Sequence, residues 1–222
     1  MVASRAAAMS AFVKDTLLVQ LTKSAGDVSA RTVALGLKVL TNVTSLQAEL
    51  AQIRQKAAAA GSNASTASEP SAADKASVKQ TMKDLKEVTI LLFDCIKANG
   101  AQLGEFTTED EADKEVLFEA AASGALSLMK LHAFAAAISV DQWHTLGWTL
   151  LCPVSAIRQR LFSTLSLAIQ MHPLHAKFLA YPCLFATDES LYARAEQALG
   201  FAVQRRRRTH EELCAQAIGS QT

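Results

Sequence analysis

Four consecutive arginines, Arg205 to Arg208, are the residues best suited to recognising a charged partner. Guanidinium groups bind phosphate and carboxylate oxygens through paired hydrogen bonds. Adjacent positions on a helix point in different directions, so at most two of the four face any one partner. The run predicts contact with phosphates or an acidic protein segment, or a nuclear-localisation signal. It fits equally a basic last turn that complements the helix dipole and pairs with Glu211 and Glu212.

Residues for a metal or catalytic centre are sparse. His172 and His175 are three residues apart, with Cys183 further along. Structural zinc sites normally have four suitable ligands, which favours two loop-end histidines on either side of Pro173. The chain has no glycine-rich phosphate loop, no HExxH motif and no nucleophile elbow. We therefore expect no catalytic, metal-binding or cofactor-binding residues, and no small-molecule substrate.

The tryptophans and cysteines are expected to be packing residues. Trp143 and Trp148 are five residues apart and do not share a helix face well, which favours core and partial-core positions over a base-stacking platform. The cysteines lie far apart, without a CxxC pair, in segments predicted to be helical: Cys95, Cys152, Cys183 and Cys214. A free thiol in a helix behaves as a small buried apolar group, so a reduced cytosolic or nuclear setting fits best.

The chain contains an internal repeat. IRQRLFSTLSLAIQ (157–170) and LYARAEQALGFAVQ (191–204) superpose at an offset of 34 residues, with Leu165 on Leu199. Each segment is helical in pattern and follows another short apolar segment. A period of this size with one helix pair per unit is typical of an α-solenoid, which binds other macromolecules along its length.

Apolar periodicity predicts helices along the chain and no β-strand. The expected helices span residues 10–22, 28–56, 76–98, 113–132, 140–151, 153–170, 174–186 and 189–208. Asn99-Gly100 is expected to end the helix before it. Small polar residues at about 57–75 predict a flexible loop. Pro182 falls inside a predicted helix and should interrupt or kink it.

These elements predict an all-α, HEAT-like helical-repeat solenoid. We expect one segment over residues 1–222, a right-handed superhelical stack of antiparallel helix pairs, with its most regular repeats at 139–208. Arg158, Arg160 and Arg194 recur at the start of the second helix of a repeat. Because stacked repeats contact only their neighbours, we expect these three to form a structural ladder of hydrogen bonds and ion pairs rather than a binding site.

Composition sets limits on the partners. The net charge of +1 gives no global field that would draw the chain to nucleic acid or to a membrane. No stretch reaches the roughly 18 uncharged apolar residues of a membrane span. Charge is nevertheless uneven, since residues 101–120 hold seven acids and one lysine, whereas 151–222 hold eight basic residues and five acids. Local charged patches are therefore expected where the average shows none.

Six stretches together carry a family resemblance. They are FVKDTLL (12–18), EAAASGALSLMKL (119–131), ISVDQWHTL (138–146), IRQRLFSTL (157–165), HPLHAKFLAYPCLFATDES (172–190) and ALGFAVQRRRRTHEEL (198–213). In this order they resemble the late helical repeats of the Pds family (precocious dissociation of sisters). The matched positions are Ile138, Gln142 and Trp143, Ile157-Arg158-Gln159, Pro173-Leu174, Leu179-Ala180, Ala186 with Asp188, and two of arginines 205–208. The chain departs from the pattern at Glu189, where the family usually has proline, and at Pro182, which has no counterpart.

The resemblance implies a nuclear, non-catalytic scaffold that regulates cohesin on chromatin, in sister-chromatid cohesion and the associated DNA repair. Its implied partners are cohesin, through the kleisin subunit, and the regulators of cohesin, with indirect contact with DNA. Family members are much longer, and their kleisin and inositol-phosphate residues lie in earlier repeats, so none is carried onto this chain, which looks like a late-repeat fragment. The alternative is an unrelated HEAT or armadillo-type adaptor in nuclear transport or trafficking. An enzyme would need a second chain to complete its site.

Overall fold

The computed structural model describes residues 29–61 and 72–219, which are mostly helical. The elements, in chain order, are α3 (Ala30–Gly61), α4 (Ala72–Lys97), β1 (Gln102–Leu103), β2 (Phe106–Thr107), α5 (Glu111–Leu128), α6 (His132–Ala137), α7 (Val140–Thr149), α8 (Ser155–Met171), the 3-10 helix η2 (Ala176–Phe185) and α9 (Tyr192–Gly219). The prediction of an all-α helical-repeat fold is confirmed. The predicted helix at 10–22 lies outside the described residues.

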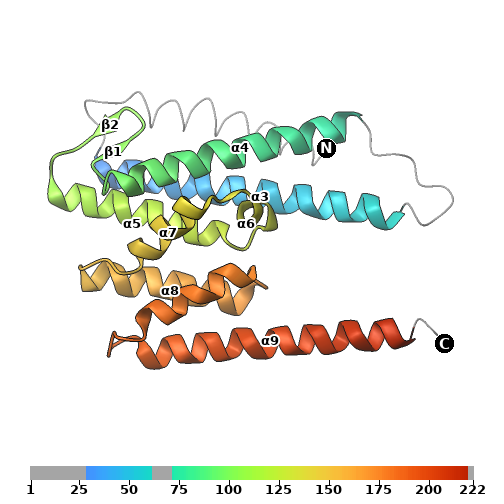
Figure 1. Cartoon of the computed structure of the whole chain (residues 1–222). Helices are drawn as coiled ribbons and strands as arrows, with labels where there is room; N and C mark the ends of the chain where they lie inside the picture. Colours follow the sequence, from blue (N-terminus) through green and yellow to red (C-terminus); the bar gives the residue numbers. More distant parts are fainter. Residues whose placement is uncertain (1–28, 62–71, 220–222) are drawn as a thin grey trace.

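The helices alternate between two layers. One layer consists of α3, α5, α8 and α9, and each packs on the next in that order. These four helices run in the same direction in Figure 1, and α4 runs back against them. The second layer contains α4, α7 and η2, with the short α6 lying against α4. An antiparallel pair therefore recurs along the stack, which is the arrangement of a helical solenoid.

A single core runs through the stack. Its largest fully buried side chains come from both layers and from the hairpin: Tyr181, Phe93, Phe134, Phe162, Phe178, Phe185, Leu37, Leu40, Leu92, Leu103, Leu117 and Leu126. Alanines and glycine on α5 permit a close approach to α3. A Cβ added at Gly124 would lie 3.1 Å from both Leu92 and Thr41, so a larger residue would push the helices apart. The alanine-rich composition thus allows the helices in this half of the molecule to lie close together.

Aromatic residues anchor η2 to three different elements. Phe178 stacks on Phe134 of α6 with ring centroids 6.3 Å apart. Tyr181 stacks on Trp143 of α7 at 5.5 Å, and its hydroxyl donates to the Trp143 carbonyl at 2.9 Å. Phe185 meets Phe162 of α8 edge-on at 4.9 Å. These contacts fix a segment whose backbone hydrogen bonding is irregular.

The predicted loop at about 57–75 is wrong at both ends. Helix α3 continues to Gly61 and α4 already begins at Ala72. Alanines 57–60 and 72–73 explain the difference, because alanine has the highest helix propensity and extends a helix that is already nucleated. Residues 62–71, the middle of that loop, lie outside the described residues.

The prediction of no strand is also wrong, because β1 and β2 form a small antiparallel hairpin. Leu103 pairs with Phe106, and the turn between them contains Gly104 at a φ of 61°. Strands of two residues are too short for the alternating pattern that reveals a strand in sequence. Leu103 and Phe106 are buried, so the hairpin covers the end of α4 with two core side chains.

The Asn99-Gly100 signal ends α4 as predicted. Both residues have positive φ angles, 50° for Asn99 and 78° for Gly100, and the Gly100 amide donates to the Cys95 carbonyl. A Cβ at Gly100 would lie 2.0 Å from the Lys114 carbonyl oxygen. Glycine is therefore required here both for its backbone angle and for the close approach of α5.

Several boundaries in the second half differ from those predicted. The helix expected at 113–132 corresponds to α5, which ends earlier, at Leu128, and the short α6 follows from His132. The helix expected at 153–170 starts after Pro153, at Ser155. The segment expected to be helical at 174–186 is the 3-10 helix η2, in keeping with the interruption predicted for Pro182, which donates no hydrogen bond. The last helix begins at Tyr192 and continues to Gly219, well beyond the expected end.

Candidate partner-binding surface

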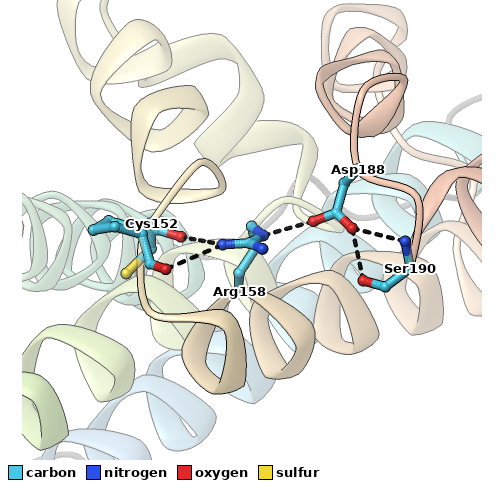
Figure 2. A network of polar contacts seen from close by, with 5 residues as sticks. Cys152, Arg158, Asp188 and Ser190 are labelled. Atoms are coloured by element: carbon cyan, nitrogen blue, oxygen red, sulfur yellow. Dashed lines mark hydrogen bonds and ion pairs between the residues drawn. The ribbon is translucent and has the colours of Figure 1, made fainter.

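Arg158 joins two successive helix pairs (Figure 2). Its Nε donates to Asp188 Oδ2 at 2.7 Å, and its Nη1 donates to the Cys152 carbonyl at 2.7 Å. A third, longer bond of 3.4 Å reaches the Pro153 carbonyl. One guanidinium therefore holds the loop that precedes α8 against the loop that precedes α9. Such charge-assisted bonds are the stronger class of hydrogen bond.

Asp188 is the shared acceptor of this network. Its Oδ1 accepts from the Ser190 hydroxyl at 2.6 Å and from the Ser190 amide at 3.0 Å. The hydrogen bond from the Ser190 side chain, followed by that from Arg158, holds the pKa of the Asp188 carboxyl below its usual value of 3.8. The carboxylate therefore stays charged and keeps both loops connected at neutral pH.

Arg160 and Arg194, which the internal repeat superposes, each contact the preceding helix of their layer, although through different interactions. Arg160 of α8 pairs with Glu119 of α5, with Nη2 and Oε2 2.7 Å apart. Arg194 of α9 lies over the Phe162 ring of α8, 5.0 Å from its centroid, and donates to Ser163 at 3.4 Å. The two positions thus reach from one repeat to the one before it.

The structure divides the arginine run into two pairs. Arg205 donates to the Gln170 carbonyl at 3.0 Å and Arg206 to the Leu174 carbonyl at 2.8 Å. Both carbonyls lie at the end of α8 or just after it, where helix carbonyls lack partners within the helix. Arg207 and Arg208 are exposed, and their side chains make no hydrogen bond or ion pair within the described part of the chain. In the same part of the chain, no ion pair joins the run to Glu211 or Glu212.

A basic cleft of about 450 Å³ lies beside Arg205 and Arg206. Among the described residues that line it, none is acidic, and His172 and His210 are on its wall. Burial and the nearby charge of Lys130 lower the pKa of His172 from its usual 6.5, against an opposing effect of Glu49. The lining suits an anionic partner with some apolar character, because Leu174 and Leu213 also face the cleft.

The residues weighed as metal ligands have separate roles. His175 Nδ1 accepts the Lys177 amide at 3.3 Å and so caps the start of η2. Cys183 is exposed. No group of three or more His, Cys, Asp or Glu side chains within the described residues is arranged to hold a metal ion.

Two expectations about buried side chains need correction. Trp148 is 72% exposed, whereas Trp143 is partly buried and its Nε1 donates to the Lys177 carbonyl at 3.3 Å. Trp148 lies on the side of α7 that is open to solvent, so its ring is left exposed. Sequence reasoning missed this surface, although the spacing of His144, Trp148 and Leu151 on one face was a signal for it.

The cysteines also differ in their exposure to solvent. Cys95 is buried, and burial raises the pKa of its thiol to about 12. Cys152 is buried but lies in the loop between α7 and α8 rather than in a helix. Cys183 and Cys214 are exposed, contrary to the expectation for all four. The general tendency of free cysteine to be buried therefore does not hold at these two positions.

A stack of helix pairs joined by charged contacts, with clefts on its surface, defines a helical-repeat scaffold protein. Residues 15–218 match the family described as sister chromatid cohesion protein PDS5. The chain therefore belongs to the PDS5 family, a cohesin-associated family of sister-chromatid cohesion, and the unrelated transport adaptor is set aside. Comparison with curated proteins and with solved structures gives no significant match. No helix of the described segments has the length and apolar character needed to cross a membrane.

Proposed function

We propose that this chain is a non-catalytic scaffold segment that binds cohesin through its kleisin subunit and regulates cohesin on chromatin in the nucleus. The associated role in DNA repair and the indirect contact with DNA belong to the same proposal. Membership of the PDS5 family supports the cohesin partner. A stack of helices stabilised along its length also suits a scaffold, because it presents an extended surface without needing a catalytic centre.

The proposal of a specific partner contact rests on the different environments of the four arginines at 205–208. Arg205 and Arg206 bond to backbone carbonyls, whereas Arg207 and Arg208 are exposed and unpaired within the described residues. Helix α9 extends beyond the end of α8 (Figure 1), and Arg207 and Arg208 follow directly after the two arginines that bind carbonyls at that end. We assign the first two to the stability of the stack and the last two to contact with an acidic segment or phosphate group of the partner.

The ladder role proposed for Arg158, Arg160 and Arg194 rests on their contacts with neighbouring helices and loops. All three contacts involve an adjacent unit of the stack, which is where a solenoid gains its cooperativity. Their substitution is expected to lower stability and to affect partner binding only through loss of structure.

The experiment compares two double variants, Arg207→Ser with Arg208→Ser, and Arg205→Ser with Arg206→Ser. The first pair should reduce co-precipitation of the kleisin subunit or of DNA while leaving the melting temperature unchanged. The second pair should lower the melting temperature, because two carbonyls lose their donors. Unchanged recovery of kleisin and DNA with the first pair would refute the contact proposed for Arg207 and Arg208. Absence of kleisin from the parent precipitate would refute the partner itself.

A further inference from the structure

An exposed tryptophan on α7 lies between two hollows of the surface. The helix that carries it is held firmly at its start, since Ser139 and Gln142 form a reciprocal capping box. Trp143, one turn earlier, is fixed by its bond to η2 and its stacking on Tyr181. Trp148 is 72% exposed, and its indole N–H makes no hydrogen bond within the described residues. A rigid helix therefore presents a large aromatic ring to solvent.

On one side of Trp148 is an apolar cleft of about 250 Å³ between α7 and η2. Its walls are mainly aromatic and aliphatic: Trp143, His144, Gly147, Trp148, Leu151, Ala180, Tyr181 and Leu184. Pockets for drug-sized ligands and cofactors typically measure about 300–1,000 Å³. The smaller volume of this cleft suits one or two side chains of a protein segment better than a whole small molecule.

On the other side of Trp148 is a hollow of about 510 Å³ that is lined in part by the first two turns of α5. Glu111 and Glu115 face it, together with Lys97 and Lys114. Lys114 is already paired with Glu111 at 2.7 Å. Glu115 is exposed and has no ion-pair partner within the described segments. Its carboxylate is thus available to a cation bound against the Trp148 ring.

The charges around these hollows favour a basic partner. Residues 109–115, at the start of α5, carry five acidic side chains against one lysine. Leu151 lines both hollows and a third one that contains the exposed Glu189. Within that third hollow, Arg158 is neutralised by Asp188. Acidic groups therefore flank the apolar residues on two sides.

We propose that Trp148, Leu151, Leu184 and Glu115, here called the Trp148 surface, bind a short protein segment that combines a bulky apolar residue with arginine or lysine. The apolar side chain enters the cleft between α7 and η2. The basic side chain lies over the Trp148 ring, where the ring quadrupole attracts a cation, and reaches Glu115. Exposed tryptophans in such positions commonly supply a large share of the binding energy of an interface.

A random peptide library displayed on phage tests this proposal directly. Peptides are selected on the full chain, counterselected on Trp148→Ala, and the survivors are synthesised for affinity measurement. We expect sequences that pair Leu, Phe or Trp with Arg or Lys. The Trp148→Ala substitution should raise the dissociation constant of these peptides roughly tenfold or more. Glu115→Lys should raise the dissociation constant by a smaller factor. That factor should decrease at high salt, because an exposed ion pair is screened.

Matched controls come from α9. Phe201→Ala removes another exposed aromatic ring, 46% accessible, and Glu196→Lys reverses another exposed acidic residue. Neither should change the affinity of the selected peptides, and all variants should keep the parent melting temperature. Selected peptides that are acidic, an empty selection, or equal affinity for Trp148→Ala would overturn the proposal. Self-association of the parent that is lost in Trp148→Ala, measured by sedimentation, would instead identify a second copy as the occupant and also overturn it.

Discussion

Arg158 Nε lies 2.7 Å from Asp188 Oδ2, although the two residues are 30 positions apart in the chain. Arg158 lies in the first turn of α8 and Asp188 lies in the loop that precedes α9, and both side chains are mostly shielded by their surroundings. The contact connects two units of the stack through one ion pair and the backbone carbonyl of Cys152. It is the clearest point at which charge, rather than apolar packing, joins neighbouring repeats.

Replacing Arg158 should destabilise the stack more than replacing Arg160. Arg158→Ala leaves Asp188 and the Cys152 carbonyl without their donor, whereas the Arg160 side chain is 57% exposed and its ion pair is better solvated. Exposed ion pairs contribute little to stability. The expected fall in melting temperature for Arg158→Ala is of the order of 5 °C in a chain of this size. Thermal melting followed by circular dichroism measures both variants, and a larger fall for Arg160→Ala would contradict this ranking.

Asp188 should make stability depend on pH in the acid range. Its pKa in the folded chain is lowered from 3.8, so its contribution is fully present above that ordinary value. The contribution is lost as the pH falls through the lower folded pKa, because the carboxyl group must then take up a proton. The difference in melting temperature between the parent and Asp188→Asn should therefore shrink below pH 3.8. A difference that stays constant from pH 7 to the acid end would show that the carboxylate charge has no role.

Leu165→Asp should be severely destabilising, while Leu167→Asp on the same helix should be tolerated. Leu165 is fully buried in the core, whereas Leu167 is 59% exposed. An unpaired buried charge is expected to reduce the free energy of unfolding by roughly 4 kcal/mol or more. Urea or thermal unfolding of the two variants provides the comparison. Equal melting of the parent and Leu165→Asp would mean that the register of α8 is wrong.

Two glycine substitutions should have opposite effects. Gly200 lies in α9 with nothing within 4 Å of an added Cβ, so Gly200→Ala should stabilise the chain by about 0.5–1 kcal/mol through helix propensity. Gly100→Ala should destabilise it, because the Cβ would overlap the Lys114 carbonyl and the φ angle is positive. Unfolding in urea gives both free energies. A stabilised Gly100→Ala variant would require the contact between α4 and α5 to be looser than the structure has it.

Thiol accessibility should separate the cysteines into two classes. Cys183 and Cys214 are exposed and should react rapidly with a thiol reagent in the native chain. Cys95 is buried with a pKa raised to about 12, and should react only after denaturation. Mass spectrometry after a short labelling pulse assigns each site. Rapid native labelling of Cys95 would indicate frequent local opening of α4 against α5.

Much of the architecture follows from local sequence patterns. The helical periodicity, the Asn99-Gly100 stop and the 34-residue offset are all local signals, and each of them corresponds to a feature of the stack. The two-residue strands and the exact ends of α3 and α9 were not predictable in this way. Short strands carry no periodic pattern, and helix ends depend on propensity and on tertiary contacts together.

The sequence by itself determined the all-α class and the repeat, because both depend on the spacing of apolar residues along one chain. Only the tertiary structure decided which charged and aromatic side chains are available to a partner. Arg205 and Arg206 bind backbone carbonyls at the end of α8 and just after it, more than 30 residues earlier, while Arg207 and Arg208 do not. Trp143 packs against η2, while Trp148 faces solvent. Residues of the same type at nearby positions in the sequence thus differ in their contacts and exposure. Their partners come from distant parts of the chain that meet only when the repeats stack.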